Sequence, residues 1–324
     1  MIDLIYTKYR AYRLEQEKKR IGVKTERFLP LFQPTGPFHF NELASHMEEM
    51  GVKSSDNILL RFSAQVAPFL EGGLTGFYKD FFDYVDSGAG NLFSLSYSFD
   101  RSPLMYFGQN EVFDPEYTPT TIGLCNEIFR RMDGVVRSLH PTHSVSVYGG
   151  DKDRIIAEHH LNPHTYSLQS PFAHLYELGS GKEVIIGLNH SSTGQHFIED
   201  KFSITGKISK PVISLLNIDG TVREIPFYVD NPFVKYIGYF KTDPFKKLLM
   251  DKGILKESKI NGITIYVHDC NKFYQEMPAV YASDNGPFKR LYLKTFVLNK
   301  IVHPLILKVF FEEREGVLFP KKKD

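Results

Sequence analysis

The most informative segment of the chain spans residues 113–145 and reads FDPEYTPTTIGLCNEIFRRMDGVVRSLHPTHSV. Its first part predicts a turn and then a helix, with Thr118 as N-cap, Pro119 at the first helical position and Gly134 as the stop. The loop at residues 137–144, RSLHPTHS, carries more hydrogen-bonding groups than a core strand needs, so it indicates a functional site. Apolar residues recur at helical spacing before it and predict one buried helix face: Ile122, Cys125, Ile128, Phe129 and Met132.

The bulk composition is that of an ordinary globular protein. The chain has 324 residues, of which 42% are hydrophobic and 24% are charged, enough for one large domain or two modest ones. Lysine and arginine number 39 against 38 aspartate and glutamate, so there is almost no net charge. A global electrostatic footprint for nucleic acid is therefore missing, and we expect no nucleic-acid partner.

The cysteines and the apolar runs bear on the compartment. Cys125 and Cys270 are far apart in sequence, and we expect two buried thiols in a reducing compartment, with no disulfide. The first twenty residues carry charges too early and too often for a secretory signal. The strongest candidate for a membrane span, residues 301–311, is interrupted by charged residues and a proline. We expect a cytoplasmic protein without a membrane span.

Helical and strand patterns alternate along the rest of the chain. Buried strands are predicted at residues 57–62 and 182–188, because both are short apolar runs bounded by turn signals. Such alternation predicts an α/β domain with a mixed central sheet flanked by helices. The other predicted elements are helices at 41–50, 75–85, 154–160 and 244–253, strands at 91–98, 144–148 and 262–268, and a β hairpin around Asp219-Gly220.

The two ends of the chain look like additions to this domain. Residues 1–37 predict a basic helix over 2–20 and a proline-containing linker, the domain spans 38–275, and residues 276–324 form a C-terminal extension. A basic helix face can contact a membrane surface or nucleic acid, but it is more often solvated, which is the interpretation we adopt. The two extensions favour a partner or a homo-oligomer.

The order of residues in the first stretch resembles the aminoglycoside 3-N-acetyltransferase family. The shared features are an FDP turn at 113–115, Thr118-Pro119, E-x-F-R at 127–130 and R-S-x-H-P-x-x-S at 137–144. The resemblance covers roughly residues 41–274. It implies a three-layer α/β/α fold, an acyltransferase, acetyl-CoA as co-substrate, no metal, and a small-molecule amine as acceptor.

The best candidates for catalysis are His196 and Glu199. On a helix these residues are at i and i+3 and share a face, where a carboxylate fixes the tautomer of an imidazole and stabilises its protonated form. In the resembled family a T-x-x-H-x-x-E element follows a strand, and Thr193, His196 and Glu199 match it. The resemblance implies that His196 deprotonates the amine and that Glu199 orients His196. It also implies that Thr193 holds the thioester carbonyl or its oxyanion. The alternative is an exposed helical pair without a catalytic role.

Four residues are candidates for the cofactor side of the site. The resemblance places Ser63, at the end of the first strand, near the thioester, although Arg61-Phe62 stand where the family often has His-Ser. It also implies that Ser138 donates to the pantetheine amide and that His140 and Ser144 lie along acetyl-CoA. His140 has an alternative role as a capping residue that holds the loop.

Two other chemistries compete with this interpretation. Nucleophilic catalysis by Ser63 or Cys125 is disfavoured because there is no G-x-S-x-G elbow and Cys125 points into the core, so we favour direct transfer. A zinc site is disfavoured because Pro141 breaks any helix through the nearby histidines and no CxxC or HExxH is present. The histidines that would compose such a site are His140, His143, His159, His160 and His164.

The expected function is acetyl-CoA-dependent N-acetylation of an amino group on an aminoglycoside or a related amino sugar, with His196 as general base. An aminoglycoside acceptor would connect the chain with antibiotic resistance. Such a polycation calls for a cleft rich in carboxylates. An amino sugar of a surface polysaccharide fits equally well, and a non-catalytic binding or assembly protein is the alternative of a different class. The loops carry no dense acidic cluster, only Asp100, Glu111, Asp114 and Asp200.

Overall fold

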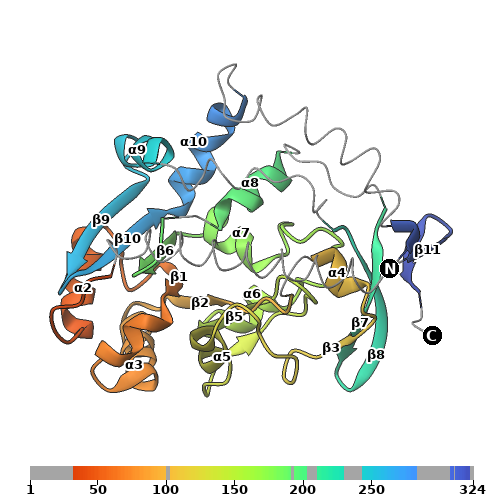
Figure 1. Cartoon of the computed structure of the whole chain (residues 1–324), viewed down its shortest axis with the longest axis horizontal. Helices are drawn as coiled ribbons and strands as arrows, with labels where there is room; N and C mark the ends of the chain where they lie inside the picture. The colour runs from red at the N-terminus through yellow and green to blue at the C-terminus, as the bar shows by residue number, and fades with distance from the viewer. Residues whose placement is uncertain are drawn as a thin grey trace, which may run out of the picture.

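The computed structural model of the chain contains two β-sheets and the helices that cover them (Figure 1). The helix expected over residues 2–20 and the acidic residue Asp100 lie outside the described residues. Among the helices that the structure describes, none is both long and apolar enough to cross a bilayer. The structure describes residues 32–99, 103–190, 193–202, 210–229, 243–282, 307–309 and 311–321.

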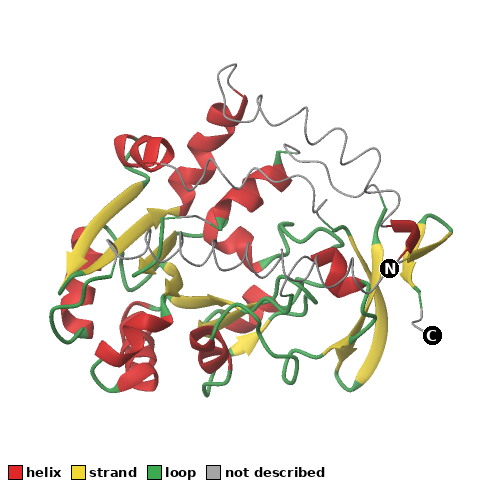
Figure 2. Cartoon of the chain, in the orientation of Figure 1, coloured by secondary structure: helices red, strands yellow, loops and turns green. Residues whose placement is uncertain are grey.

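The larger sheet has seven strands and is mixed (Figure 2). Its central strand β1 pairs in parallel with β2 on one side and with β6 on the other, whereas the outer strands pair antiparallel. In spatial order the strands are β4 (Val136–Arg137), β5 (Val145–Gly149), β2 (Asn91–Leu95), β1 (Asn57–Phe62), β6 (Gly181–Ile186), β10 (Ile263–Asp269) and β9 (Leu255–Ile260).

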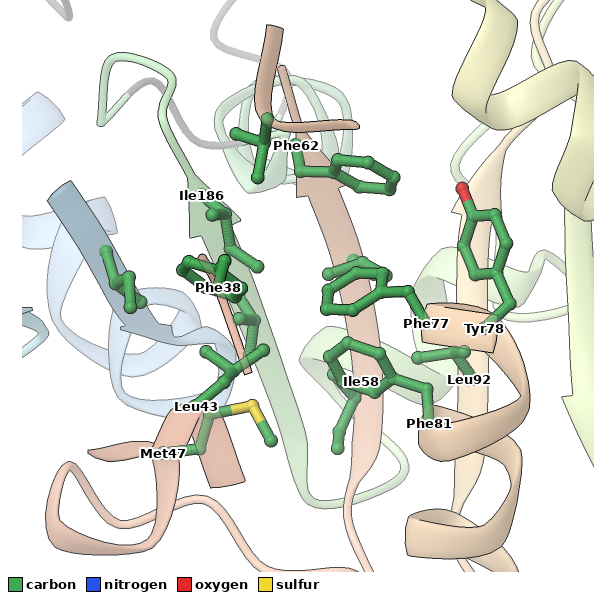
Figure 3. Packing of buried hydrophobic residues seen from close by; sticks show 14 of the residues in the cluster. Phe38, Leu43, Met47, Ile58, Phe62, Phe77, Tyr78, Phe81, Leu92 and Ile186 are labelled. Atoms are coloured by element: carbon green, nitrogen blue, oxygen red, sulfur yellow. The ribbon is translucent and has the colours of Figure 1, made fainter. Parts of the chain in front are cut away.

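Three helices cover one face of this sheet, below it in Figure 1. They are α2 (Phe40–Glu49), α3 (Gly73–Gly88) and α5 (Leu124–Arg130), and the 3-10 helix Ala64–Phe69 lies beside α3. Figure 3 shows their aromatic and aliphatic side chains packed on the apolar side of the strands. Fully burying such a side chain stabilises the fold by about 1.5–3 kcal/mol. The labelled side chains are Phe38, Leu43, Met47, Ile58, Phe62, Phe77, Tyr78, Phe81, Leu92 and Ile186.

The opposite face carries the helices drawn above the sheet in Figure 1. Helices α7 and α8 pack on the middle of the sheet, and α9 and α10 cover the β6–β10–β9 side. Helix α10 continues across the domain boundary expected at residue 275, and the other expected boundaries stay a prediction. The helices are α6 (Lys152–Ile156), α7 (Pro171–Tyr176), α8 (Gly194–Lys201), α9 (Asp243–Asp251) and α10 (Cys270–Ala282).

A second sheet, at the right of Figure 1, is built largely on the predicted hairpin. The hairpin turn at Asp219-Gly220 has positive φ at both residues, 52° and 79°, as a tight two-residue turn requires. The C-terminal extension adds two strands and pairs Leu318 with Val212. This sheet contains β3 (Val112–Phe113), β7 (Val212–Ile218), β8 (Thr221–Phe227), β11 (Phe311–Arg314) and β12 (Val317–Pro320), with α4 (Pro103–Phe107) beside it.

The predicted α/β/α class with a mixed central sheet is confirmed. The predicted start of the helix after the FDP turn, with Thr118 as N-cap, is wrong. Helix α5 begins at Leu124, and Thr118 caps the turn instead, where its hydroxyl accepts the backbone N–H of Asp114 at 2.9 Å. Thr120 and Thr121 bond to the backbone of Tyr97 and hold this segment outside the helix. Hydroxyl bonds to a distant strand end therefore outcompete the local N-cap signal.

Candidate active site

The topology brings the predicted polar loops to one edge of the large sheet. The parallel strands β1, β2 and β6 all end there, and β5 begins there because it runs antiparallel to β2. Ser63 donates its backbone N–H to Ile186 at 3.0 Å, and Ser96 donates to Ser144 at 2.9 Å. In open α/β sheets ligands bind outside the carboxyl ends of the strands, where neighbouring connections diverge. This edge therefore meets the geometric requirement for a site.

Helix α8 presents the predicted His–Glu pair at this edge. His196 Nδ1 lies 2.9 Å from Glu199 Oε2, and Gln195 Nε2 donates to Glu199 Oε1 at 2.9 Å. The Glu199 side chain is 5% exposed, whereas that of His196 is 46% exposed. Since a carboxylate oxygen can only accept, Nδ1 carries the proton toward Glu199, and Nε2 of the neutral ring is the proton acceptor. The pair has the orientation that a general base needs.

Thr193, the third member of the T-x-x-H-x-x-E element, is anchored inside the protein. Its hydroxyl donates to Glu183 Oε1 at 3.3 Å, and its backbone N–H approaches the same oxygen at 3.4 Å. Arg61 Nη1 also donates to that oxygen, at 2.8 Å. The hydroxyl assigned by resemblance to the thioester carbonyl thus already has an acceptor in the protein.

Sequence reasoning missed the ion pair of Arg61 and Glu183. A signal was present, because each is a charged residue within an otherwise apolar strand, in NILLRF and in KEVII. Such residues are rarely buried unless they are paired. The pairing of β1 with β6 joins segments about 120 residues apart and cannot be read from local pattern, so the partner could not be inferred.

Arg137, the first residue of the 137–144 loop, is a buried structural cation. Its guanidinium donates to Ser144 Oγ at 2.9 Å and to the Ser96 carbonyl at 2.6 Å, and it also bonds to the Thr118 carbonyl. It lies over the Phe113 ring at 4.9 Å. Burial lowers the pKa of Arg137 to about 9, which still leaves it charged at neutral pH. This residue ties together the FDP turn, the end of β2 and the loop.

Ser138 and Ser144 face the interior, and both are fully buried. Ser138 Oγ accepts the backbone N–H of Val145 at 2.9 Å and lies 2.9 Å from His159 Nδ1. Because His159 Nε2 faces the Thr165 carbonyl, Nδ1 is the acceptor and the Ser138 hydroxyl donates to it. Ser144 Oγ donates to the Ser96 carbonyl at 2.6 Å. The geometry gives both hydroxyls a role in holding the loop, whereas the resemblance implied contact with acetyl-CoA.

His140 follows the alternative that the sequence left open. Its Nδ1 accepts the backbone N–H groups of Thr142 at 3.3 Å and His143 at 3.0 Å, so the imidazole caps the turn. Ser63 differs from these loop residues because it is only partly buried and accepts from Gln65 N–H at 3.3 Å. Of the four candidates for the cofactor side, Ser63 is the one that reaches the surface of the sheet edge.

Tyr166 lies between the 137–144 loop and helix α8. Its ring centroid is 5.7 Å from that of His143 and 6.5 Å from that of His196. Tyr97 and Phe99, which follow β2, contact His143 from the other side at 4.7 and 5.1 Å. The two regions implied by the resemblance are thus joined through an aromatic row. His143 is the central member of this row.

Neither the metal nor the nucleophile alternative gains support. His159 is fully buried, and burial lowers its pKa to about 3, while both its ring nitrogens are engaged in hydrogen bonds. No group of three metal-ligating side chains suited to an ion occurs in the parts of the chain that the structure describes. Cys125 and Cys270 are free and buried as predicted, and burial raises the pKa of Cys125 to about 11, which disfavours a reactive thiolate.

Sequence comparisons point to one family. A sequence model of the family described as aminoglycoside 3-N-acetyltransferase matches residues 102–282, more than half of the 324 residues. The chain is also 26% identical over 184 residues to the SPbeta prophage-derived aminoglycoside N(3')-acetyltransferase-like protein YokD of Bacillus subtilis (strain 168). That match covers 51% of this chain and 66% of the relative's length.

Solved structures agree on the fold. The apoenzyme of aminoglycoside acetyltransferase AAC(3)-IVa superposes with a TM-score of 0.60 at 21% identity, covering 79% of this chain and 92% of that chain. AAC-IIIb in its binary form with CoASH gives a TM-score of 0.57 at 17% identity, covering 72% and 92%. At these identities the structural likeness establishes the fold alone, and the family is established by the sequence model that matches residues 102–282. The chain therefore belongs to the aminoglycoside 3-N-acetyltransferase family of acyltransferases.

Proposed function

We propose that the protein transfers the acetyl group of acetyl-CoA directly to an amino group of an aminoglycoside or a related amino sugar. The observation that carries this proposal is the His196–Glu199 contact of 2.9 Å at the carboxyl edge of the sheet. A buried carboxylate holds a half-exposed imidazole in the tautomer whose Nε2 can take a proton. Family membership supplies the reaction class.

In the proposed reaction the acceptor nitrogen attacks the thioester carbonyl carbon and forms the C–N bond. His196 Nε2 takes the proton that the nitrogen loses, and Glu199 stabilises the resulting imidazolium. The C–S bond then breaks, and the coenzyme A thiolate leaves and can receive that proton. General base catalysis of this kind contributes about 10²–10⁴-fold to the rate. Holding both substrates in attack geometry contributes on the order of 7–11 kcal/mol more.

Acetyl-CoA as co-substrate is supported by the AAC-IIIb structure, which was solved with CoASH. On this chain Ser63 is our candidate for contact near the thioester, because it ends β1 at the site edge and is only partly buried. Three other residues would fix the conformation of the 137–144 loop and not contact acetyl-CoA, since their polar groups already bond within the protein: Ser138, His140 and Ser144.

The proposed acceptor class is supported by the ligands of similar solved structures and depends on which carboxylates of this chain are available to a cation. A variant of AAC(3)-IVa with a histidine replaced by alanine was solved with apramycin, and AAC-VIa was solved with sisomicin. On this chain Asp114 offers little to a polycation, because Asn217 and two backbone N–H groups already occupy its carboxylate. We therefore keep both acceptors, the aminoglycoside and the amino sugar of a surface polysaccharide. A growth test with and without kanamycin-class drugs separates them.

The test of the mechanism is thiol release from acetyl-CoA with a panel of amines, comparing wild type with His196→Ala. We expect kcat/KM to fall by about 10²–10⁴-fold in the variant. His39→Ala is a matched control, because His39 also contacts a glutamate, Glu71, at 2.6 Å and is 44% exposed. It should keep wild-type activity. Equal rates for wild type and His196→Ala would remove His196 from the mechanism, and coenzyme A binding without turnover would favour a binding protein.

A further inference from the structure

A fully buried carboxylate lies in the middle of the large sheet, behind the proposed base. Glu183 belongs to β6, between β1 and β10, and is 0% exposed. The same strand continues with Val184, Ile185 and Ile186, all buried. A charge in such a place costs several kcal/mol in lost hydration unless partners compensate it. The contacts of Glu183 therefore indicate what it does.

One oxygen of this carboxylate joins two parts of the molecule. Glu183 Oε1 accepts from Arg61 Nη1 at 2.8 Å, and Arg61 comes from the neighbouring strand β1. The same oxygen accepts from the hydroxyl of Thr193 at 3.3 Å and approaches its backbone N–H at 3.4 Å. Thr193 directly precedes helix α8 and is its N-cap residue. The ion pair in the sheet is thus bonded to the first turn of the helix that carries the base.

The start of α8 has little room to move. On one side Thr193 is bonded to Glu183, and on the other Gly194 packs so closely on Tyr176 that an added Cβ would lie 2.2 Å from the ring. His196 donates its backbone N–H to the Thr193 carbonyl at 3.3 Å. A shift of Thr193 would therefore be transmitted directly to His196.

We infer that Glu183, held by Arg61, is a positioning residue that fixes the start of helix α8 and thereby the attack geometry of His196. This inference rests on the proposed function. The ion pair is a poor source of stability, because a buried pair can often be replaced by apolar residues of similar volume without loss. Its effect on the site can therefore be separated from its effect on folding.

The first experiment is a double-mutant cycle of Arg61→Met and Glu183→Leu, with urea midpoints and kinetic constants measured for each protein. Each single variant removes one member of the ion pair and leaves the other charge in the sheet without it, so its urea midpoint and its kcat should both fall. In the double variant we expect the midpoint to recover in part, because Thr193 still lacks its acceptor, while kcat stays about 10²-fold below wild type, since a misplacement of about 1 Å costs that much. The KM for acetyl-CoA should stay within about twofold of wild type. Recovery of kcat together with the midpoint would overturn the inference.

A second measurement needs no acceptor and therefore separates this inference from the proposed function. The imidazole Cε1–H signal of His196 is assigned by its loss in His196→Ala and followed by NMR. In the double variant we expect it to shift or broaden, while the signal of His39 stays unchanged. An unchanged His196 signal would also overturn the inference. Wild-type protein without turnover on any amine would overturn the proposed function, whatever the NMR result.

Discussion

The 137–144 loop and the start of helix α8 both carry residues that belong to motifs of the resembled family, but these residues differ in how accessible they are to solvent. In the loop, Ser138 and Ser144 are fully buried and bonded within the protein. On α8, His196 keeps 46% of its side chain exposed and is backed by a buried carboxylate. A shared motif therefore does not distinguish buried residues that hold a loop from residues that stay accessible for the proposed reaction. Solvent access and the supply of internal partners do.

The largest expected effect is that of Arg137→Leu, which tests the structural role of the loop. The substitution removes the buried cation and leaves the carbonyls of Ser96 and Thr118 without this donor. We expect the free energy of unfolding to fall by about 3–5 kcal/mol, measured by urea denaturation. His196→Ala should change it by no more than about 0.5 kcal/mol, since that side chain is half exposed. A loss below about 1 kcal/mol for Arg137→Leu would contradict the structural role of the loop.

Glu199→Gln tests the role proposed for Glu199 on helix α8. A glutamine has one acceptor oxygen where Glu199 has two, and Gln195 competes for it. When the new amide group faces His196 Nδ1, it favours the ring tautomer that carries its proton on Nε2 and cannot act as base. We expect kcat to fall on the order of 10²-fold, about 2.7 kcal/mol in barrier height, with little change in the unfolding midpoint. Gln195→Leu keeps the carboxylate and should retain most of the activity, and an unchanged kcat for Glu199→Gln would argue against the orienting role.

Acid should weaken the loop region through His159. Burial lowers the pKa of this residue to about 3, whereas an unfolded histidine has a pKa near 6.5. Below about pH 6.5 the unfolded state therefore binds the extra proton, and stability is lost as the pH falls toward 3, by about 1.4 kcal/mol per pH unit. His159→Gln keeps a donor and an acceptor but does not titrate, so its unfolding free energy should fall less steeply between pH 6 and 4. Equal slopes for the two proteins would count against a buried neutral His159.

The smallest expected effects come from substitutions of Ser63 and Ser138, both of which the resemblance assigns to the cofactor side of the site. Ser138→Ala removes the acceptor of Val145 N–H and the donor to His159, so we expect a loss of about 1–2 kcal/mol with an unchanged KM for acetyl-CoA. Ser63→Ala removes one long cap bond, from Gln65 N–H at 3.3 Å, so we expect a loss of about 0.5 kcal/mol and a raised KM. Urea denaturation and steady-state kinetics on both variants check this, and the reverse outcome would return Ser138 to the cofactor side.

Much of the secondary structure followed from local pattern. The strand predicted at 57–62 is β1 (Asn57–Phe62), and the predicted hairpin turns at Asp219-Gly220. These predictions are confirmed because short apolar runs and turn residues act over a few residues. Strand β9 was missed, since LKESKI is mostly polar and is a strand because it pairs with β10. The second sheet was also not predicted, because it joins segments from distant parts of the chain.

Local sequence is enough to predict the α/β class, the main strands and a helix on which His196 and Glu199 share one face. Those features depend on periodicity and on spacings of a few residues. Which polar groups are buried depends on the folded arrangement, since their partners come from far along the chain: Glu183 bonds to Arg61, and Arg137 bonds to Ser96. A side chain's chemistry depends on its remaining access to water and on its bonding partners, and both are set by segments that the local sequence does not contain.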